Sequence, residues 1–92
     1  MEYVWDRAKA AANAAKHAVD FVDAMRIFEK PTVQWIDRRF GYGEERWIAI
    51  GLLEETELVV VYVEKGENTR RIISARRASR AERQIYWRQV QD

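Results

Sequence analysis

The sequence has no cysteine, a single histidine and a single proline among its 92 residues. Disulfides, cysteine nucleophiles, iron–sulfur clusters and zinc sites built on cysteine are therefore excluded. Because His17 is the only imidazole, a metal site with several histidine ligands is excluded as well. The acidic residues show no spacing typical of a divalent-ion site, so we expect neither a metal nor another cofactor.

The motifs of two enzyme classes are also missing. No Gly-x-Ser-x-Gly segment presents a nucleophilic serine, which argues against a serine hydrolase. The chain has only four glycines, and Gly41-Tyr42-Gly43, which we interpret as a turn, lacks the third glycine of a phosphate-binding loop. The chemistry must therefore come from other residue types.

Long apolar runs are absent too. No segment approaches the roughly 18–20 apolar residues that cross a bilayer. The start of the chain, Met1 to Asp6, lacks the basic and then apolar order of a signal peptide, and neither end has a lipidation motif. We expect a cytoplasmic protein with no membrane contact.

The composition favours a folded protein. Hydrophobic residues make up 48% of the chain and charged residues 34%, a balance typical of globular proteins. The length suits one domain, and we expect residues 1–92 to form it. A domain of this size has a thin margin of stability, so a partner that covers apolar surface would help it.

Helices are predicted at the start of the chain. Asp6 is a suitable N-cap for a helix that runs to about His17 and is rich in alanine. Asp20 is the next N-cap, and Pro31 ends the second helix. The apolar stripe of this second helix has the spacing i, i+3, i+4, i+7, in Phe21, Ala24, Met25 and Phe28.

Strands are predicted next, followed by a last helix. The strand segments are residues 32–37, 46–53, 58–63 and 69–76. Their short connections predict an antiparallel meander. Ser79 and Glu82 form a capping box that begins the C-terminal helix. The fold class is therefore α+β, with two N-terminal helices packed on one face of a twisted antiparallel sheet of about four strands, and a C-terminal helix.

Positive charge gathers in the last third of the chain. Residues 1–63 have eight Lys or Arg against eleven Asp or Glu, whereas residues 64–92 have eight against four. Arginine matches phosphate with a planar fork of donors, so this segment is a candidate phosphate-binding surface. A solvated helix face with an exposed strand edge is the plainer interpretation.

The strand at 69–76 is unusual because arginines flank its isoleucines. By strict alternation, Arg71 and Ile73 point to one face of the sheet, and Ile72 and Arg76 point to the other. Each face would then carry two arginines, with Arg70 beside Arg76 and Arg77 beside Arg71. An exposed face and a functional face explain this pattern equally well.

An ordered set of residues along most of the chain carries a family resemblance. These residues are Trp5-Asp6, Lys9-Ala10, Asn13, Lys16-His17, Val19, Phe21, Ala24, Phe28, Gly43-Glu44, Arg46, Ile50-Gly51, Val60-Val61-Tyr62, Arg71-Ile72-Ile73-Ser74-Ala75-Arg76, Ala78, Glu82-Arg83 and Tyr86. With this set the chain resembles the BrnT family of bacterial type II toxins. It departs at Ala18, where the family usually has glycine, and at Lys65, where it usually has arginine.

The resemblance implies a RelE-like fold and an RNA cleavage that stops translation, with messenger RNA as the substrate on or off the ribosome. It also implies a BrnA-type antitoxin as partner. Such antitoxins carry a DNA-binding domain, so operator DNA is reached only through the antitoxin.

RelE-like ribonucleases work without metal, because the 2′-hydroxyl of the substrate attacks the adjacent phosphate. This chemistry needs a base, an acid and cations for the phosphorane. The resemblance makes Arg71 and Arg76 the candidates that hold the phosphate. Further candidates for the phosphate or the RNA strand are Arg46, Lys16, Arg77 and Arg80.

The identity of the base stays open at this point. Lys65 or Lys16 would serve if neighbouring arginines lowered its pKa, and Glu64 and His17 compete with them. His17 also suits the C-terminal end of its helix, where a cation meets the helix dipole. Tyr86 is a candidate for stacking on RNA, and equally a core anchor of the last helix.

Two other functions remain in competition with the ribonuclease. One is a catalytically weak or inactive module that only binds its antitoxin or RNA, which the change at Lys65 motivates. The other is a nucleic-acid-binding regulator that uses the surface of residues 70–88. The chain has no helix-turn-helix or RNA-recognition aromatic motif, so this last function ranks third.

Overall fold

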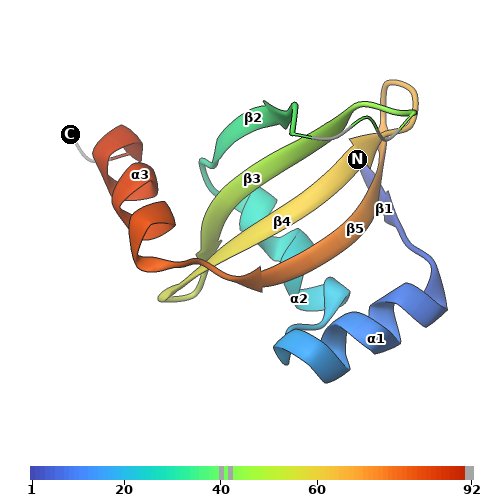
Figure 1. Cartoon of the computed structure of the whole chain (residues 1–92), viewed down its shortest axis with the longest axis horizontal. Helices are drawn as coiled ribbons and strands as arrows, with labels where there is room; N and C mark the ends of the chain where they lie inside the picture. Colours follow the sequence, from blue (N-terminus) through green and yellow to red (C-terminus); the bar gives the residue numbers. More distant parts are fainter. Residues whose placement is uncertain (40, 42, 91–92) are drawn as a thin grey trace.

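The computed structural model describes residues 1–39, 41 and 43–90. In this part of the chain a single sheet has the strand order β1-β5-β4-β3-β2 (Figure 1). The strands are β1 (Glu2–Val4), β2 (Val33–Asp37), β3 (Arg46–Leu53), β4 (Thr56–Glu64) and β5 (Thr69–Arg77). The helices are α1 (Arg7–His17), α2 (Phe21–Ala24), the 3₁₀ helix η1 (Met25–Glu29) and α3 (Arg80–Val90).

The α+β class and the C-terminal helix are confirmed, but the sheet is larger than predicted. The four predicted strands pair in an antiparallel manner as β2 to β5. A fifth strand, β1, pairs in parallel with β5, so the sheet is mixed. Three residues are too few to show an alternating pattern, which is why the sequence did not reveal β1. The RelE-like description of the fold stays a prediction.

The largest differences in the boundaries concern the second helix and β4. The second predicted helix divides into α2 and η1, and it ends at Glu29, before Pro31. Thr56 and Glu57, expected in a polar connection, begin β4. The predicted turn at Gly41-Tyr42-Gly43 includes Tyr42, which lies outside the described residues.

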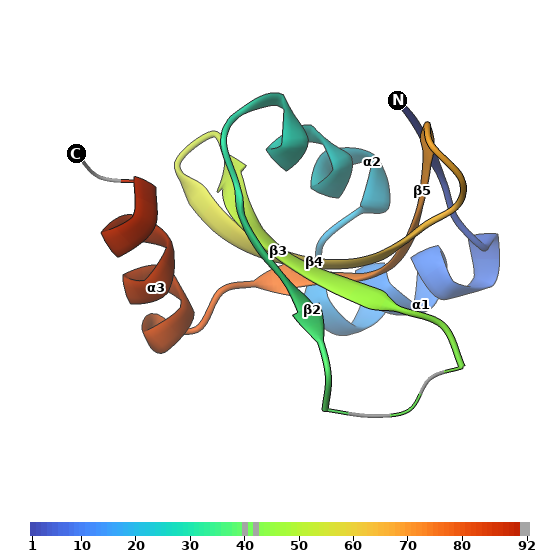
Figure 2. The same cartoon turned by 90° about the horizontal axis from the view of Figure 1, so that it is seen from above.

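The two N-terminal helices do not share one face of the sheet. Figure 2 shows α2 above the strands and α1 beside β5. The apolar residues of α2 and η1 pack on the sheet face formed by Ala49, Val60 and Ile72, here called the α2 face. The position of α1 is set by Asn13, whose side chain bonds to the backbone of β5.

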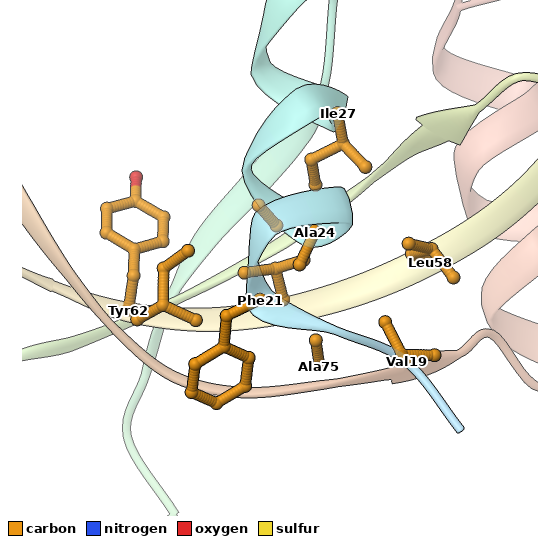
Figure 3. Close-up of a cluster of buried hydrophobic side chains, with 10 residues drawn as sticks. Val19, Phe21, Ala24, Ile27, Leu58, Tyr62 and Ala75 are labelled. Carbon is orange, nitrogen blue, oxygen red and sulfur yellow. The ribbon is translucent and has the colours of Figure 1, made fainter. Parts of the chain in front are cut away.

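The main core lies under α2 and η1 (Figure 3). Its fully buried side chains include Phe21, Ile27 and Tyr62. Gly51 lets η1 lie close to β3, because a Cβ atom there would come within 2.9 Å of the Ile27 Cβ and the Thr32 Cγ2. A side chain at this position would push the helix off the sheet.

The opposite face of the sheet is only partly covered. It carries Ile48, Val59 and Val61 and is here called the α3 face, because Tyr86 of α3 packs on it. The helix α3 stands at one end of the sheet (Figures 1 and 2). The rest of the α3 face is therefore open to form a site. Within the described residues, each helix is too short or too polar to cross a bilayer.

Candidate functional site

A β-bulge in β5 decides which arginines share a face. Val61 pairs with Ser74 but Tyr62 pairs with Ile72, so Ile73 has no partner and the alternation shifts by one residue. Because paired side chains lie on the same face, Arg71 and Arg76 both lie on the α3 face, opposite Val63 and Val59.

The prediction from strict alternation, which separated Arg71 from Arg76, is therefore wrong. Arg70 and Arg77 lie on the α2 face instead. There the Arg70 guanidinium lies 4.7 Å from the ring centre of Phe28 and 4.8 Å from that of Tyr62, so it packs with the core.

Three cations surround one carboxylate at the end of the α3 face. The Arg71 Nη2 donates to both oxygens of Glu44, at 2.9 and 2.7 Å. The Lys65 Nζ and the Arg46 Nη2 each lie 3.7 Å from a Glu44 oxygen. Partial burial of this carboxylate opposes its ionisation, but Arg71, Lys65 and Arg46 together lower its pKa below the usual value. We call Glu44, Arg46, Lys65 and Arg71 the Glu44 cluster.

A second ion pair stands at the other end of the same face. The Nη1 and Nη2 atoms of Arg76 donate to the two oxygens of Glu82, each at 2.8 Å. Glu82 also completes the predicted capping box, because it accepts from the backbone N–H of Ser79 at 2.8 Å. The hydrogen bond from Arg76 is the main cause that lowers the pKa of Glu82 to about 2. Arg76 is thus held in a fixed orientation.

A groove lies between this ion pair and β2. Its volume is about 510 Å³, and Ile48, Val59 and Val61 form its apolar part. Trp35 lines it from β2. Its remaining lining residues are Ile36, Asp37, Arg38, Arg39, Arg76 and Glu82. The groove therefore combines an apolar floor with a charged rim.

The helix α1 adds cations along the free edge of β5. Lys9, Lys16 and His17 line a shallow hollow of about 240 Å³ together with Ser74 and Ile73 of the bulge. Lys9 and Lys16 are seven residues apart and so lie on one side of the helix. The candidates Lys16 and His17 therefore lie beside β5, the strand that carries Arg71 and Arg76.

The structure does not bring the side chains of the other predicted site residues into the Glu44 cluster or the groove. Glu64 pairs with Arg70, which puts its side chain on the α2 face, and Arg77 lies on that face too. Arg80 is exposed at the start of α3. Tyr86 is only 3% exposed, and its hydroxyl lies 3.5 Å from the Pro31 carbonyl oxygen, so its ring belongs to the core.

Sequence reasoning missed three groups of the site. Glu44 stands in a segment of the family resemblance, but no local pattern showed that it would meet Arg71. The pair of Asp37 and Arg39 also escaped notice, because a carboxylate that ends a strand resembles an ordinary turn residue. Lys9 has the spacing of seven from Lys16, and this helical periodicity could have identified it.

The arrangement suits a ligand that carries phosphate and flat apolar groups. Guanidinium and ammonium groups supply donors for phosphate oxygens, and the apolar groove accepts a ring. The single carboxylate inside the Glu44 cluster can also accept a proton. The geometry therefore fits a nucleic-acid strand, with proton-transfer groups at one end of its path.

Comparisons with known proteins agree with this chemistry. Residues 5–82 match the family model described as the ribonuclease toxin BrnT of a type II toxin–antitoxin system. Among solved structures, the chain is similar to the Brucella abortus ribonuclease toxin BrnT, with a TM-score of 0.67 and 28% sequence identity. The similarity covers 87% of this chain and 99% of the Brucella chain. A search of curated proteins gives no match.

Proposed function

Because this chain belongs to the BrnT family of ribonuclease toxins from type II toxin–antitoxin systems, we propose that it cuts messenger RNA internally and so inhibits translation. Membership of the family implies an RNA substrate and an antitoxin partner. As partner we propose a BrnA-type antitoxin in the cytoplasm, which carries the complex to operator DNA. The observation that supports cleavage most directly is the Glu44 cluster.

In the proposed reaction, three cations hold the scissile phosphate. The 2′-oxygen of the RNA forms a bond to the adjacent phosphorus while the bond to the 5′-oxygen breaks, which gives a 2′,3′-cyclic phosphate and a 5′-hydroxyl. Negative charge grows on the phosphorane oxygens in the transition state. Arg46, Lys65 and Arg71 are already oriented around one carboxylate, and they stabilise that charge without further rearrangement.

Two groups of the cluster suit the proton transfers. We assign the Glu44 carboxylate as the acceptor of the 2′-hydroxyl proton, because it lies among the cations that would hold the phosphate. The Lys65 ammonium, whose Nζ lies 3.7 Å from the Glu44 Oε1, donates a proton to the leaving 5′-oxygen. No metal takes part in this scheme. Lys65 keeps the positive charge that the family's arginine supplies, but lacks its bidentate fork.

The other candidate bases have less favourable positions. Glu64 belongs to the opposite face of the sheet. His17 and Lys16 line the hollow beside β5, where we propose that they contact the RNA strand rather than the reacting atoms. Arg76 extends the cationic surface along the α3 face, and Arg77 and Arg80 are peripheral candidates for phosphate contacts. The burial of Tyr86 favours its interpretation as a core anchor.

The proposal is tested with purified protein and RNA labelled at its 5′ end, in the presence of a chelator. We expect fragments that end in a 2′,3′-cyclic phosphate, with a rate that the chelator does not change. Arg71→Ala should lower this rate about 10²–10³-fold, since it removes the main donor to the phosphorane. Arg26→Ala is the matched control, because Arg26 is exposed and pairs only with Asp23 among the described residues.

The alternative is a module that only binds RNA or its antitoxin. Lys65 supports it, because the loss of a bidentate contact would weaken phosphate binding at the reacting centre. Intact RNA after incubation with the protein, together with normal translation in a cell-free reaction, would favour this alternative over the ribonuclease.

A further inference from the structure

The groove on the α3 face has the features of a site for one nucleobase. We propose that it binds a single unpaired guanine of the RNA strand, an inference that rests on the proposed function because it names what the same face recognises. The residues that carry it are Trp35, Val61 and Arg76, with the ion pairs of Glu82 and Asp37 at the rim.

The size and floor of the groove suit a planar ring. Its volume of about 510 Å³ exceeds that of one nucleotide, and its floor is formed by Ile48, Val59 and Val61 from adjacent strands. Trp35 lies in register with Ile48 and adds an indole beside this floor. Aromatic and apolar side chains bind the faces of unstacked bases, and this contact alone does not distinguish one base from another.

The polar rim presents donors to the groove. The Asp37 side chain is only 2% exposed, and its oxygens accept from the backbone N–H, the Nε and the Nη2 of Arg39. The Glu82 oxygens accept from Arg76 and from the Ser79 backbone. Both carboxylates are thus engaged by neighbours, and Arg76 is the rim residue whose remaining donors can bind a ligand.

Arg76 has the geometry that selects between bases. Its bonds to Glu82 and to the Arg77 carbonyl use both Nη1 hydrogens and one Nη2 hydrogen. The Nε–H and the second Nη2–H have no acceptor in the described part of the chain, and these two donors point in parallel. Guanine offers O6 and N7 as adjacent acceptors for such a fork, whereas adenine places an amino group next to N7.

The position of the groove fits the proposed cleavage site. Arg71 and Arg76 lie on the same face of the same strand because of the bulge at Ile73. An RNA strand whose phosphate binds the Glu44 cluster can therefore place a nearby base against Trp35 and Val61. Paired bases cannot enter the groove, so the strand must be single-stranded at this point.

Binding of free nucleotides to the intact protein tests the proposal without any cleavage. The signal of the Trp35 indole N–H in an NMR spectrum, assigned by its loss in Trp35→Phe, reports on the groove. We expect guanosine 5′-monophosphate to shift this signal at a concentration about tenfold lower than adenosine or cytidine 5′-monophosphate. Ribose 5-phosphate, which has no base, should leave the signal in place.

Two variants separate the base contact from general charge. Arg76→Lys keeps the positive charge but loses the fork, so guanosine 5′-monophosphate should bind about as weakly as the adenosine compound. Val61→Phe should fill the groove and abolish the shift for every nucleotide, while the isosteric Val61→Thr keeps it. Thermal unfolding confirms that each variant is folded, and Arg76→Lys changes no core residue.

The outcomes distinguish this inference from the proposed function. Equal affinity for all nucleotides, or a shift that Arg76→Lys does not change, would overturn the guanine assignment. A Trp35 signal that no nucleotide moves, in a protein that cuts RNA, would overturn the base site and leave the ribonuclease intact. If the protein binds guanosine 5′-monophosphate selectively but cuts no RNA, the base site is supported and the proposed ribonuclease function is wrong.

Discussion

Asn13 takes the place of a neighbouring strand beside Ala75. Its side-chain amide donates to the Ala75 carbonyl oxygen at 2.8 Å, and its oxygen accepts from the Ala75 backbone N–H at 3.1 Å. The same amide donates to the Val19 carbonyl oxygen at 3.0 Å. β1 pairs only with Thr69 to Arg71, so it does not reach Ala75 at the edge of β5. The Asn13 side chain forms the hydrogen bonds to Ala75 that a neighbouring strand would form.

Asn13→Ala should therefore destabilise the protein by about 2–4 kcal/mol, since it leaves three buried backbone groups without partners. Chemical denaturation measures this loss as a lower midpoint. Asn68→Ala, at an exposed turn position, is the control and should change the stability by less than about 0.5 kcal/mol. A loss at Asn13 no larger than at Asn68 would contradict the role of Asn13.

Ala18 adopts a conformation that suits glycine. It caps α1 with φ 59° and ψ 32°, in the left-handed region, and its N–H bonds to the Ala14 carbonyl oxygen at 2.9 Å. Ala18→Gly should stabilise the protein by about 0.5–1 kcal/mol, because glycine has no Cβ to strain this cap. Ala15→Gly, at an exposed position near the end of α1, should instead destabilise the protein by up to about 1 kcal/mol. If both substitutions lowered the stability, Ala18 would not be strained in the wild-type protein.

Glu44 should behave as a base rather than as a binding residue. We expect Glu44→Gln to lower kcat about 10²–10⁴-fold with little loss of RNA affinity. In Glu44→Ala, added formate should restore part of the rate, because a free carboxylate can take the same proton. Its neighbour Glu45 is exposed, and Glu45→Gln should leave kcat unchanged. A Glu44→Ala variant that formate does not rescue would leave Glu44 with a positioning role only.

The pair of Arg76 and Glu82 makes stability depend on acid pH. The pKa of Glu82 falls from 4.5 to about 2 on folding, so its carboxylate stabilises the folded state fully above about pH 4.5. This stabilisation is lost as the pH falls from about 4.5 towards 2. Melting temperatures of Glu82→Gln should accordingly be lower than wild type at pH 6 and converge with it near pH 2. Glu55 is an exposed carboxylate, so the melting temperature of Glu55→Gln should change with pH in the same way as that of the wild type.

Lys9 and Lys16 should bind the RNA strand through its phosphates. Each contact with single-stranded nucleic acid adds about 0.7 to the slope of log affinity against log salt, because a counterion is released. Lys9→Ala and Lys16→Ala should each reduce the magnitude of this slope by about that amount. Lys30→Ala removes a charge that lines the separate groove between β2 and α3. If Lys30→Ala reduced the slope by the same amount, the effect would come from the net charge of the protein and not from contacts of Lys9 and Lys16.

Local chemistry in the sequence determined most of the secondary structure. Asp6 accepts from the Ala8 N–H at the start of α1, and Ser79 and Glu82 bond to each other's backbone N–H at the start of α3. These caps are contacts between near neighbours, so their spacing is visible in the chain. The apolar run at 58–63 likewise predicted a strand, and β4 contains it.

Arg46, Lys65, Arg71 and Arg76 were candidates from the sequence, but the tertiary structure alone decided how they come together. The bulge at Ile73 depends on the register between β4 and β5, and it moves Arg76 to the face of Arg71. Glu44 meets Arg71 across 27 residues of sequence, and Asn13 meets Ala75 across 62. Residue types and short spacings contain no information on such pairings, because contacts between distant segments depend on how the whole sheet and its helices pack.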